Sequence, residues 1–216
     1  MLIEKHEEQL VADLLSFWGK YKKVILSLFF TTLLWISFNS YKSYHSHQRQ
    51  LIAAEHYQNY LDAIHRDDFQ TGERSLKLLQ KEYAKSSYAA LASMTQVHYE
   101  LKDARYEVAH NLLNWVEHNT VIPFLKSLAV YKNAEINYLE KNYDHSIFLL
   151  SKINHKSELS YLIDHLSAKT YAALNKIEIS KEIYEKMLEQ DNIDPALQSL
   201  LVAEYNYLIL KSKNGI

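Results

Sequence analysis

The sequence contains no cysteine, and only three of its 216 residues are glycine and two are proline. Without thiols the chain forms no disulfide and no Cys-ligated zinc site, and it has no cysteine nucleophile. Glycine and proline shape tight turns and end helices, so their scarcity argues against an all-β or doubly wound α/β fold. The sequence therefore predicts an all-α protein of long helices, stabilised by packed apolar surface.

The charges nearly cancel, with 24 Lys and Arg against 26 Asp and Glu. Nucleic-acid binding needs clustered basic side chains that displace counterions from phosphates, and the basic residues of this chain are scattered. We therefore expect no nucleic-acid partner.

A run without charge extends from residue 24 to residue 41, with the sequence VILSLFFTTLLWISFNSY. As a helix rising about 1.5 Å per residue it spans about 27 Å, close to the ~30 Å hydrocarbon core of a bilayer. Trp18, Tyr21 and Tyr41 lie at the two ends, where aromatic side chains meet lipid headgroups. We predict a single transmembrane helix over residues 24–41 that contacts the lipid bilayer.

Two other interpretations of this run are a cleaved signal peptide and a buried core helix. A signal peptide starts with a short basic segment and ends at a small-x-small site, whereas 23 residues precede Val24 and no Ala-x-Ala follows. A core helix carries polar residues on every turn, and this run carries few. Both interpretations fit less well than a membrane span.

Basic residues near the ends of the run indicate its orientation. Lys20, Lys22 and Lys23 precede it, and Lys42 and Arg49 follow it. Because basic residues favour the cytoplasmic side, residues 1–23 are predicted to be cytoplasmic. Residues 42–50 then form a juxtamembrane connection, and the domain of residues 51–216 lies across the membrane.

Small residues recur along this domain at spacings of 34, 37 and 34 residues, and a second set precedes them by twelve. A period near 34 is typical of helix-turn-helix units of the tetratricopeptide repeat (TPR) kind, in which small residues let two antiparallel helices cross closely. We predict a TPR-like right-handed superhelix of antiparallel hairpins. The first set is Ser75, Ala109, Ser146 and Ser180, and the second is Ala63, Val97, Ala134 and Ala168.

Turn and cap signals in phase with this period give the bounds of the units. Four hairpins are predicted over residues 51–83, 88–118, 123–154 and 160–190, with a C-terminal capping helix from Pro195 to about Leu210. The turns within hairpins fall at residues 70–72, 102–104, 141–142 and 175–176, and each contains a Gly, Asp or Asn residue, which tolerates non-helical dihedral angles. The 37-residue step predicts an insertion around residues 118–122.

The histidines do not form a recognisable metal or catalytic motif. Glu107 and His110 give one Glu-x-x-His, but a di-iron bundle needs two such motifs with further carboxylates. His45 and His47 diverge on a helix, and three scattered glycines cannot build a phosphate loop. We expect no enzyme activity, no cofactor, no metal and no small-molecule substrate.

The inner face of the superhelix is where a TPR-like fold grips a partner. With Ser146 at the small position of its hairpin, the same register selects two or three residues on the first helix of three hairpins. These partner-binding candidates are Met94, His98, Tyr131, Glu135, Tyr138, His165 and Lys169.

Short motifs in order along the chain carry a resemblance to one family. They are EQLV (residues 8–11), FW (17–18), KK (22–23), YAALA (88–92), KNYD (141–144) and DPAL (194–197). Together with the single span, they resemble the YfgM-type ancillary subunit of the bacterial Sec translocon, a single-pass inner-membrane protein with a periplasmic TPR-like domain.

The resemblance implies a non-enzymatic scaffold with a cytoplasmic N-terminus in the bacterial cell inner membrane. It implies association with the Sec translocon and with a membrane-anchored periplasmic chaperone of the prolyl-isomerase type, assisting export or folding of secreted proteins. Two alternatives remain from the residues themselves. One is an envelope assembly or cell-division scaffold. The other is an anchor that holds a cytoplasmic regulator through Leu10, Leu14, Phe17 and Trp18.

Overall fold

The computed structural model of the protein describes residues 2–154, 158–190 and 193–214, and all regular structure in these ranges is helical. The chain divides into two compact units, residues 1–51 and residues 52–216. The helices are α1 (Leu2–His65), α2 (Phe69–Glu82), α3 (Ser87–Lys102), α4 (Tyr106–Asn119), α5 (Pro123–Leu139), α6 (Tyr143–Ser151), α7 (Ser160–Ala173), α8 (Ile177–Leu188) and α9 (Pro195–Asn214). The predicted all-α fold is therefore confirmed.

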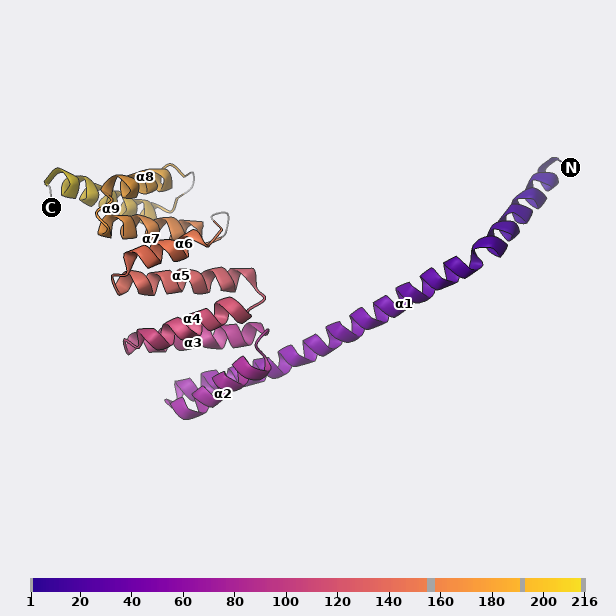
Figure 1. The fold of residues 1–216 in the computed structure, drawn as a ribbon, viewed down its shortest axis with the longest axis horizontal. Coiled ribbons are helices and arrows are strands. Elements are labelled where there is room, and N and C mark those ends of the chain that lie inside the picture. The colour runs from indigo at the N-terminus through magenta and orange to yellow at the C-terminus, as the bar shows by residue number, and fades with distance from the viewer. Residues whose placement is uncertain (1, 155–157, 191–192, 215–216) are drawn as a thin grey trace. The chain divides into compact units, whose positions relative to one another are not determined.

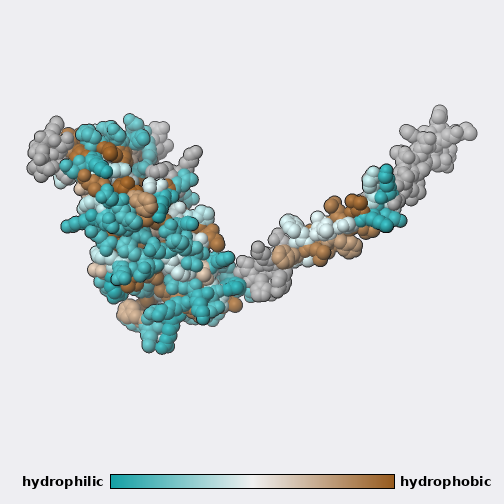
Figure 2. Space-filling view, viewed as in Figure 1, coloured by the Kyte–Doolittle hydropathy of each residue, from teal (hydrophilic) through white to brown (hydrophobic). Residues whose placement is uncertain are grey.

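The first unit is formed by the N-terminal part of α1 and contains an exposed apolar segment. Within the described residues, Lys20–Phe38 is the one window long and apolar enough to cross a membrane, and none of it is buried. Figure 2 shows this apolar surface in brown along the helix. The window overlaps the predicted span of residues 24–41 and begins earlier because it includes the basic residues Lys20, Lys22 and Lys23.

The helix does not break after the apolar segment. The backbone stays helical through residues 42–50, so the predicted juxtamembrane connection is part of α1. The side chains of Leu10, Leu14 and Phe17, proposed above as a docking face, lie outside the described part of the chain, as do those of Tyr41 and Lys42.

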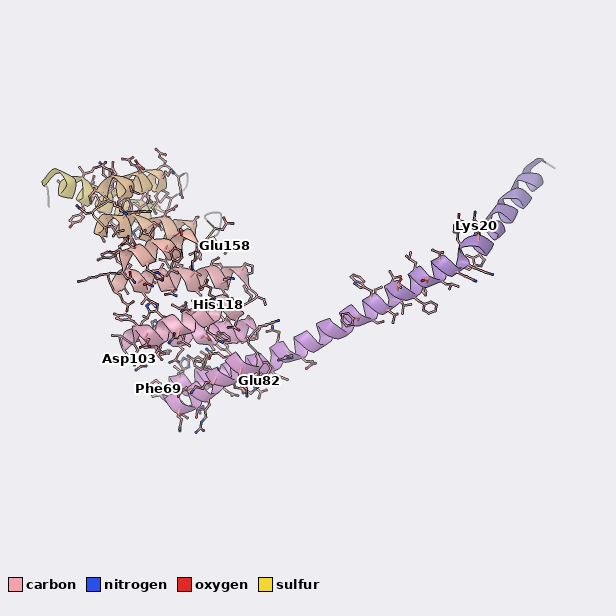
Figure 3. All side chains as sticks on the ribbon, in the orientation of Figure 1. Lys20, Phe69, Glu82, Asp103, His118 and Glu158 are labelled. Atoms are coloured by element: carbon pink, nitrogen blue, oxygen red, sulfur yellow. The ribbon has the colours of Figure 1, made fainter. Side chains whose placement is uncertain are left out.

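The second unit stacks helical hairpins in chain order. The end of α1 pairs with α2, and the pairs α3 with α4, α5 with α6, and α7 with α8 follow, with α9 packed on α8 (Figure 1). In Figure 3, Phe69 and Asp103 mark the edge that carries the turns within hairpins, whereas Glu82, His118 and Glu158 mark the opposite edge with the connections between hairpins. The predicted packing of antiparallel helical hairpins is therefore confirmed.

The four turns within hairpins share one backbone geometry. The second residue after each first helix has a positive φ, between 53° and 64°. The next N–H donates to the carbonyl five residues earlier, as Arg105 N does to Glu100 O at 2.8 Å, which is the bond of a Schellman motif. The residues with positive φ are Asp67, Ala104, Lys141 and Asn175.

Ala104 offers a direct test of this turn geometry. A left-handed backbone costs an L-residue about 1–2 kcal/mol, whereas glycine adopts it freely. Ala104→Gly is expected to stabilise the domain by about 1 kcal/mol, measured by denaturant unfolding. Ala54→Gly, inside α1, is the matched control and is expected to destabilise by a similar amount. A loss of stability in Ala104→Gly contradicts the turn geometry.

Small residues bring the two helices of a hairpin together at the predicted positions in three hairpins. Ala109, Ser146 and Ser180 are fully buried. The Ser146 hydroxyl donates to the Ala134 carbonyl at 2.8 Å, and the Ser180 hydroxyl donates to the Ala168 carbonyl at the same distance. A side-chain oxygen reaches the facing backbone only where the helices cross closely, so these positions are confirmed as close-packing sites.

In the first hairpin the predicted register is wrong by three residues, because Gly72 and not Ser75 is the small residue at the helix crossing. The turn lies at residues 66–68, so Gln70, Thr71 and Gly72, predicted as the turn, belong to the first turns of α2. Gly72 holds the position of Ala109, because each lies five residues after the residue with positive φ. Gly72 is buried whereas Ser75 is not fully buried, and a Cβ on Gly72 would lie 3.0 Å from the Cδ1 of Ile64.

The corrected register changes the period. The small positions are Gly72, Ala109, Ser146 and Ser180, at spacings of 37, 37 and 34 residues. The insertion predicted around residues 118–122 is therefore wrong, because the first step is as long as the second. The connection between α4 and α5 has only three residues, Thr120–Ile122, and Pro123 begins α5 as predicted.

Candidate functional site

A cavity of about 450 Å³ lies at the C-terminal end of the second unit, between α7 and α9. This volume lies within the range of ligand pockets, about 300–1,000 Å³. Three tyrosines line it, together with small residues of α7 and α9. The lining residues are Tyr138, Lys169, Ala172, Ala173, Tyr184, Ala203, Glu204, Tyr207 and Leu208.

Glu204 of α9 ties this helix to the fourth hairpin. Its Oε2 lies 2.7 Å from Nε2 of His165 on α7 and accepts a hydrogen bond of 3.0 Å from the Tyr184 hydroxyl on α8. Burial raises the pKa of Tyr184, and the Glu204 carboxylate adds to this shift, so the phenol stays protonated and donates. The glutamate therefore meets two partners inside the protein.

Lys169 has a different environment. Its Nζ lies 5.6 Å from the centre of the Tyr138 ring, within the range of a cation–π contact. Among the described residues no carboxylate lies within ion-pair distance of this ammonium group. Glu135, predicted for the same face one hairpin earlier, pairs with Lys132 at 2.7 Å. Lys169 is thus a cation of the cavity that forms no ion pair with a carboxylate of the described residues.

The structure brings together three of the seven predicted partner-binding residues. Tyr138 and Lys169 line the cavity, and His165 contacts its Glu204. Met94 packs against the core of the second and third hairpins, and His98 is exposed with its ring against Tyr99. Those two residues do not line this cavity.

Tyr131, another residue of the predicted set, lies in the core. Its side chain is only 7% exposed and belongs to the core cluster formed with Ala134, Leu150 and Ile163. The reason is that α5 contacts α4, α6 and α7, so most of its circumference is covered. Tyr131 therefore has a structural role in the core and offers almost no surface to a partner.

The burial of Tyr131 predicts that the free energy of unfolding depends on pH. Burial raises its pKa to about 12, with Glu135 adding to the shift, from about 10 in an unfolded chain. The folded state keeps the proton that the unfolded state loses, so stability falls by about 1.4 kcal/mol per pH unit as the pH rises from about 10 to about 12. Tyr131→Phe is expected to make this decline shallower in urea unfolding across that range. The exposed Tyr207→Phe is the control, and equal slopes for Tyr131→Phe and wild type would count against the burial of this phenol.

Sequence reasoning missed the contribution of α9 to the site. Glu204, Tyr207 and Leu208 were assigned to a capping helix, so the cavity between that helix and α7 was not anticipated. A signal is present in the sequence. Apolar or small residues recur at positions 200, 203, 207 and 210, at a helical spacing. They form a second apolar stripe on the helix, in addition to the buried Leu201 and Leu208.

The described residues contain no group of three or more His, Asp or Glu side chains that could hold a metal ion. His110, the histidine of the single Glu-x-x-His, lies with Nδ1 2.5 Å from Oδ1 of Asn133 and Nε2 2.8 Å from Oε2 of Glu140. It joins α4 to α5. The side chains of His45 and His47 lie outside the described part.

Stacked helical hairpins with an open cavity between α7 and α9 are typical of a repeat scaffold for protein–protein interaction. The sequence matches the family model described as tetratricopeptide repeat-like domain over residues 15–205. This match covers more than half of the chain, so the protein belongs to that family. The comparisons with curated proteins and with solved structures find no match.

Proposed function

We propose that the protein is a non-enzymatic, membrane-anchored scaffold of the bacterial cell inner membrane. The apolar segment of α1 crosses the membrane once, with residues 1–23 in the cytoplasm and the hairpin array in the periplasm. The array associates with the Sec translocon and with a membrane-anchored chaperone of the prolyl-isomerase type, and assists export or folding of secreted proteins.

The observation that carries the proposal is an exposed apolar helix joined without a break to a TPR-like array. Exposed apolar side chains such as Leu28, Leu34 and Phe38, each more than two-thirds exposed, have no protein surface to cover them in the described residues. A bilayer covers such a segment at its full length. The matching motifs at residues 8–11, 88–92 and 194–197 support the translocon as the neighbour.

The anchor contributes to function by raising local concentration. A tethered domain meets a partner in the same membrane at an effective concentration far above that in solution, so modest contacts suffice for association. The surface that fits a contact of this kind is the cavity wall of Tyr138, Lys169 and Tyr207. Tyr207 is 66% exposed, so a partner reaches it without rearrangement of the array.

Photocrosslinking in intact cells tests both the surface and the partner. A photoreactive phenylalanine analogue replaces Tyr207, and the control carries it at Phe148, an exposed residue of α6 outside the cavity. We expect products with translocon subunits or the prolyl-isomerase chaperone from position 207 and few from position 148. Co-purification from detergent identifies the same proteins without crosslinking.

The other outcomes contradict defined parts of the proposal. Products that contain cell-wall or division enzymes instead of translocon subunits favour the envelope assembly scaffold. Products from position 148 but not from position 207 place the contact outside the cavity. A cytoplasmic protein captured through residues 1–23 favours the regulator anchor.

A further inference from the structure

Resting on the proposed function of the same cavity, we infer that the cavity and the adjoining side of α9 bind an acidic amphipathic segment of a partner protein, with an apolar side chain in the cavity and a carboxylate beside Lys169. The juxtaposition that carries this inference is an apolar cavity lined by tyrosines beside Lys169, whose ammonium group has no ion-pair partner in the part of the chain that the structure describes.

The apolar side chain fits because of the chemistry of the wall. Tyr138, Tyr184 and Tyr207 line the cavity with aromatic side chains, and alanines of α7 and α9 line it beside them. Aromatic walls bind a bulky apolar side chain well, because the contact area is large and the rings lose little conformational freedom. The cavity therefore accepts one anchor residue of a polypeptide.

The contact surface continues along α9 beyond the cavity. Leu200, Ala203, Tyr207 and Leu210 are all exposed and recur at spacings of three, four and three residues, so they share one side of the helix. Ala203 and Tyr207 also line the cavity, which makes the two surfaces continuous. A segment with apolar residues at a helical spacing matches this stripe, in the manner of a helix lying in a groove.

The charges in the cavity determine whether an acidic or a basic partner segment is favoured. Glu204 already meets His165 and Tyr184, so it gains little from an incoming cation. Lys169 is partly buried and contacts only the Tyr138 ring among the interactions found in the described residues, so a carboxylate placed beside it gains an ion pair in a partly dry site. An acidic segment is therefore favoured over a basic one.

The test compares two fluorescein-labelled amphipathic peptides of equal length and the same leucine pattern, one with Glu and one with Lys at every polar position. Binding to the full chain in detergent micelles is measured by fluorescence anisotropy at low ionic strength. We expect the acidic peptide to bind about ten-fold tighter than the basic one, with a preference that weakens as salt is added.

Three variants assign the preference to the site. Lys169→Gln is expected to abolish the acidic preference, and Tyr207→Ala is expected to weaken both peptides. Lys181→Gln on α8 is the matched control, because it removes the same charge from a lysine that pairs with Glu178 at 3.0 Å. Circular dichroism of each variant verifies that the helices persist.

Equal binding of the two peptides, an acidic preference that survives in Lys169→Gln, or the absence of binding by either peptide overturns the inference. Crosslinks from position 207 to translocon subunits that persist in any of these cases leave the proposed function standing, with only the partner chemistry wrong. Loss of those crosslinks as well rejects both.

Discussion

Replacing Ala168 by leucine is expected to destabilise the hairpin array by about 1–3 kcal/mol through overpacking. Ala168 has no exposed surface and packs with Tyr184, Met187 and Leu201. Its carbonyl accepts the Ser180 hydroxyl at 2.8 Å, so α7 and α8 are too close for three more carbon atoms. Separating them also breaks that hydrogen bond, which adds about 1 kcal/mol.

Thermal and urea unfolding followed by circular dichroism measures this loss. For a domain of this size, each 1 kcal/mol corresponds to a fall in Tm of about 2–4 °C. Ala196→Leu is the matched control, because Ala196 is exposed at the start of α9 and its enlargement meets no neighbouring helix. An unchanged Tm in Ala168→Leu would mean that the register of the repeat is wrong.

The second large effect is expected in the apolar segment of α1. Leu28 and Leu34 are 69% and 70% exposed, so in a bilayer they face lipid or a membrane partner. An arginine near the centre of a membrane helix costs about 2.5–3.5 kcal/mol on insertion scales, and two arginines double the cost. The double variant Leu28→Arg, Leu34→Arg is expected to leave the membrane fraction.

Fractionation of salt-washed lysates by centrifugation measures this change, with immunodetection of the full chain in pellet and supernatant. The control is Leu51→Arg with Ile52→Arg, which places the same two charges on exposed positions of α1 after the apolar segment. It is expected to stay in the pellet. Retention of the Leu28→Arg, Leu34→Arg variant in the pellet would show that α1 is not the anchor.

Most of the fold can be predicted from the sequence because the residues that begin helices and the small residues at helix crossings are recognisable locally. Pro123 begins α5, and the Asp194 carboxylate accepts from the N–H of Ala196 at 2.9 Å as the cap of α9. Buried small residues place the last three hairpins correctly. The left-handed residues themselves are not recognisable by type, since Ala104 and Lys141 rarely adopt positive φ.

The first hairpin shows where residue size fails as a guide. Gly72 and Ser75 are both small and lie three residues apart on neighbouring positions of one helix face, so a spacing search accepts either. The burial of Gly72, Leu76 and Leu79 decides the register, because these three share the side of α2 that packs on α1 and α3. That choice depends on tertiary contacts that a period alone does not contain.

The site was predicted only in part for a similar reason. Residues on the first helices of hairpins were selected by register, which finds Tyr138, His165 and Lys169 but also selects Tyr131. Whether such a position is surface or core depends on how many neighbours cover its helix. The residues that α9 contributes to the cavity, Glu204 above all, depend on how the last helix packs on the array, which the repeat register does not specify.

Cysteine labelling in intact cells tests the anchored, periplasmic array most directly, because the chain has no cysteine of its own. Lys85, exposed between α2 and α3, and Lys20, exposed before the apolar segment, are each replaced by cysteine in separate variants. A maleimide that crosses the outer but not the inner membrane is expected to label the Lys85→Cys variant in intact cells. It is expected to label the Lys20→Cys variant only after lysis. Labelling of Lys20→Cys with protection of Lys85→Cys, or recovery of the full chain in the soluble fraction, contradicts the proposed topology.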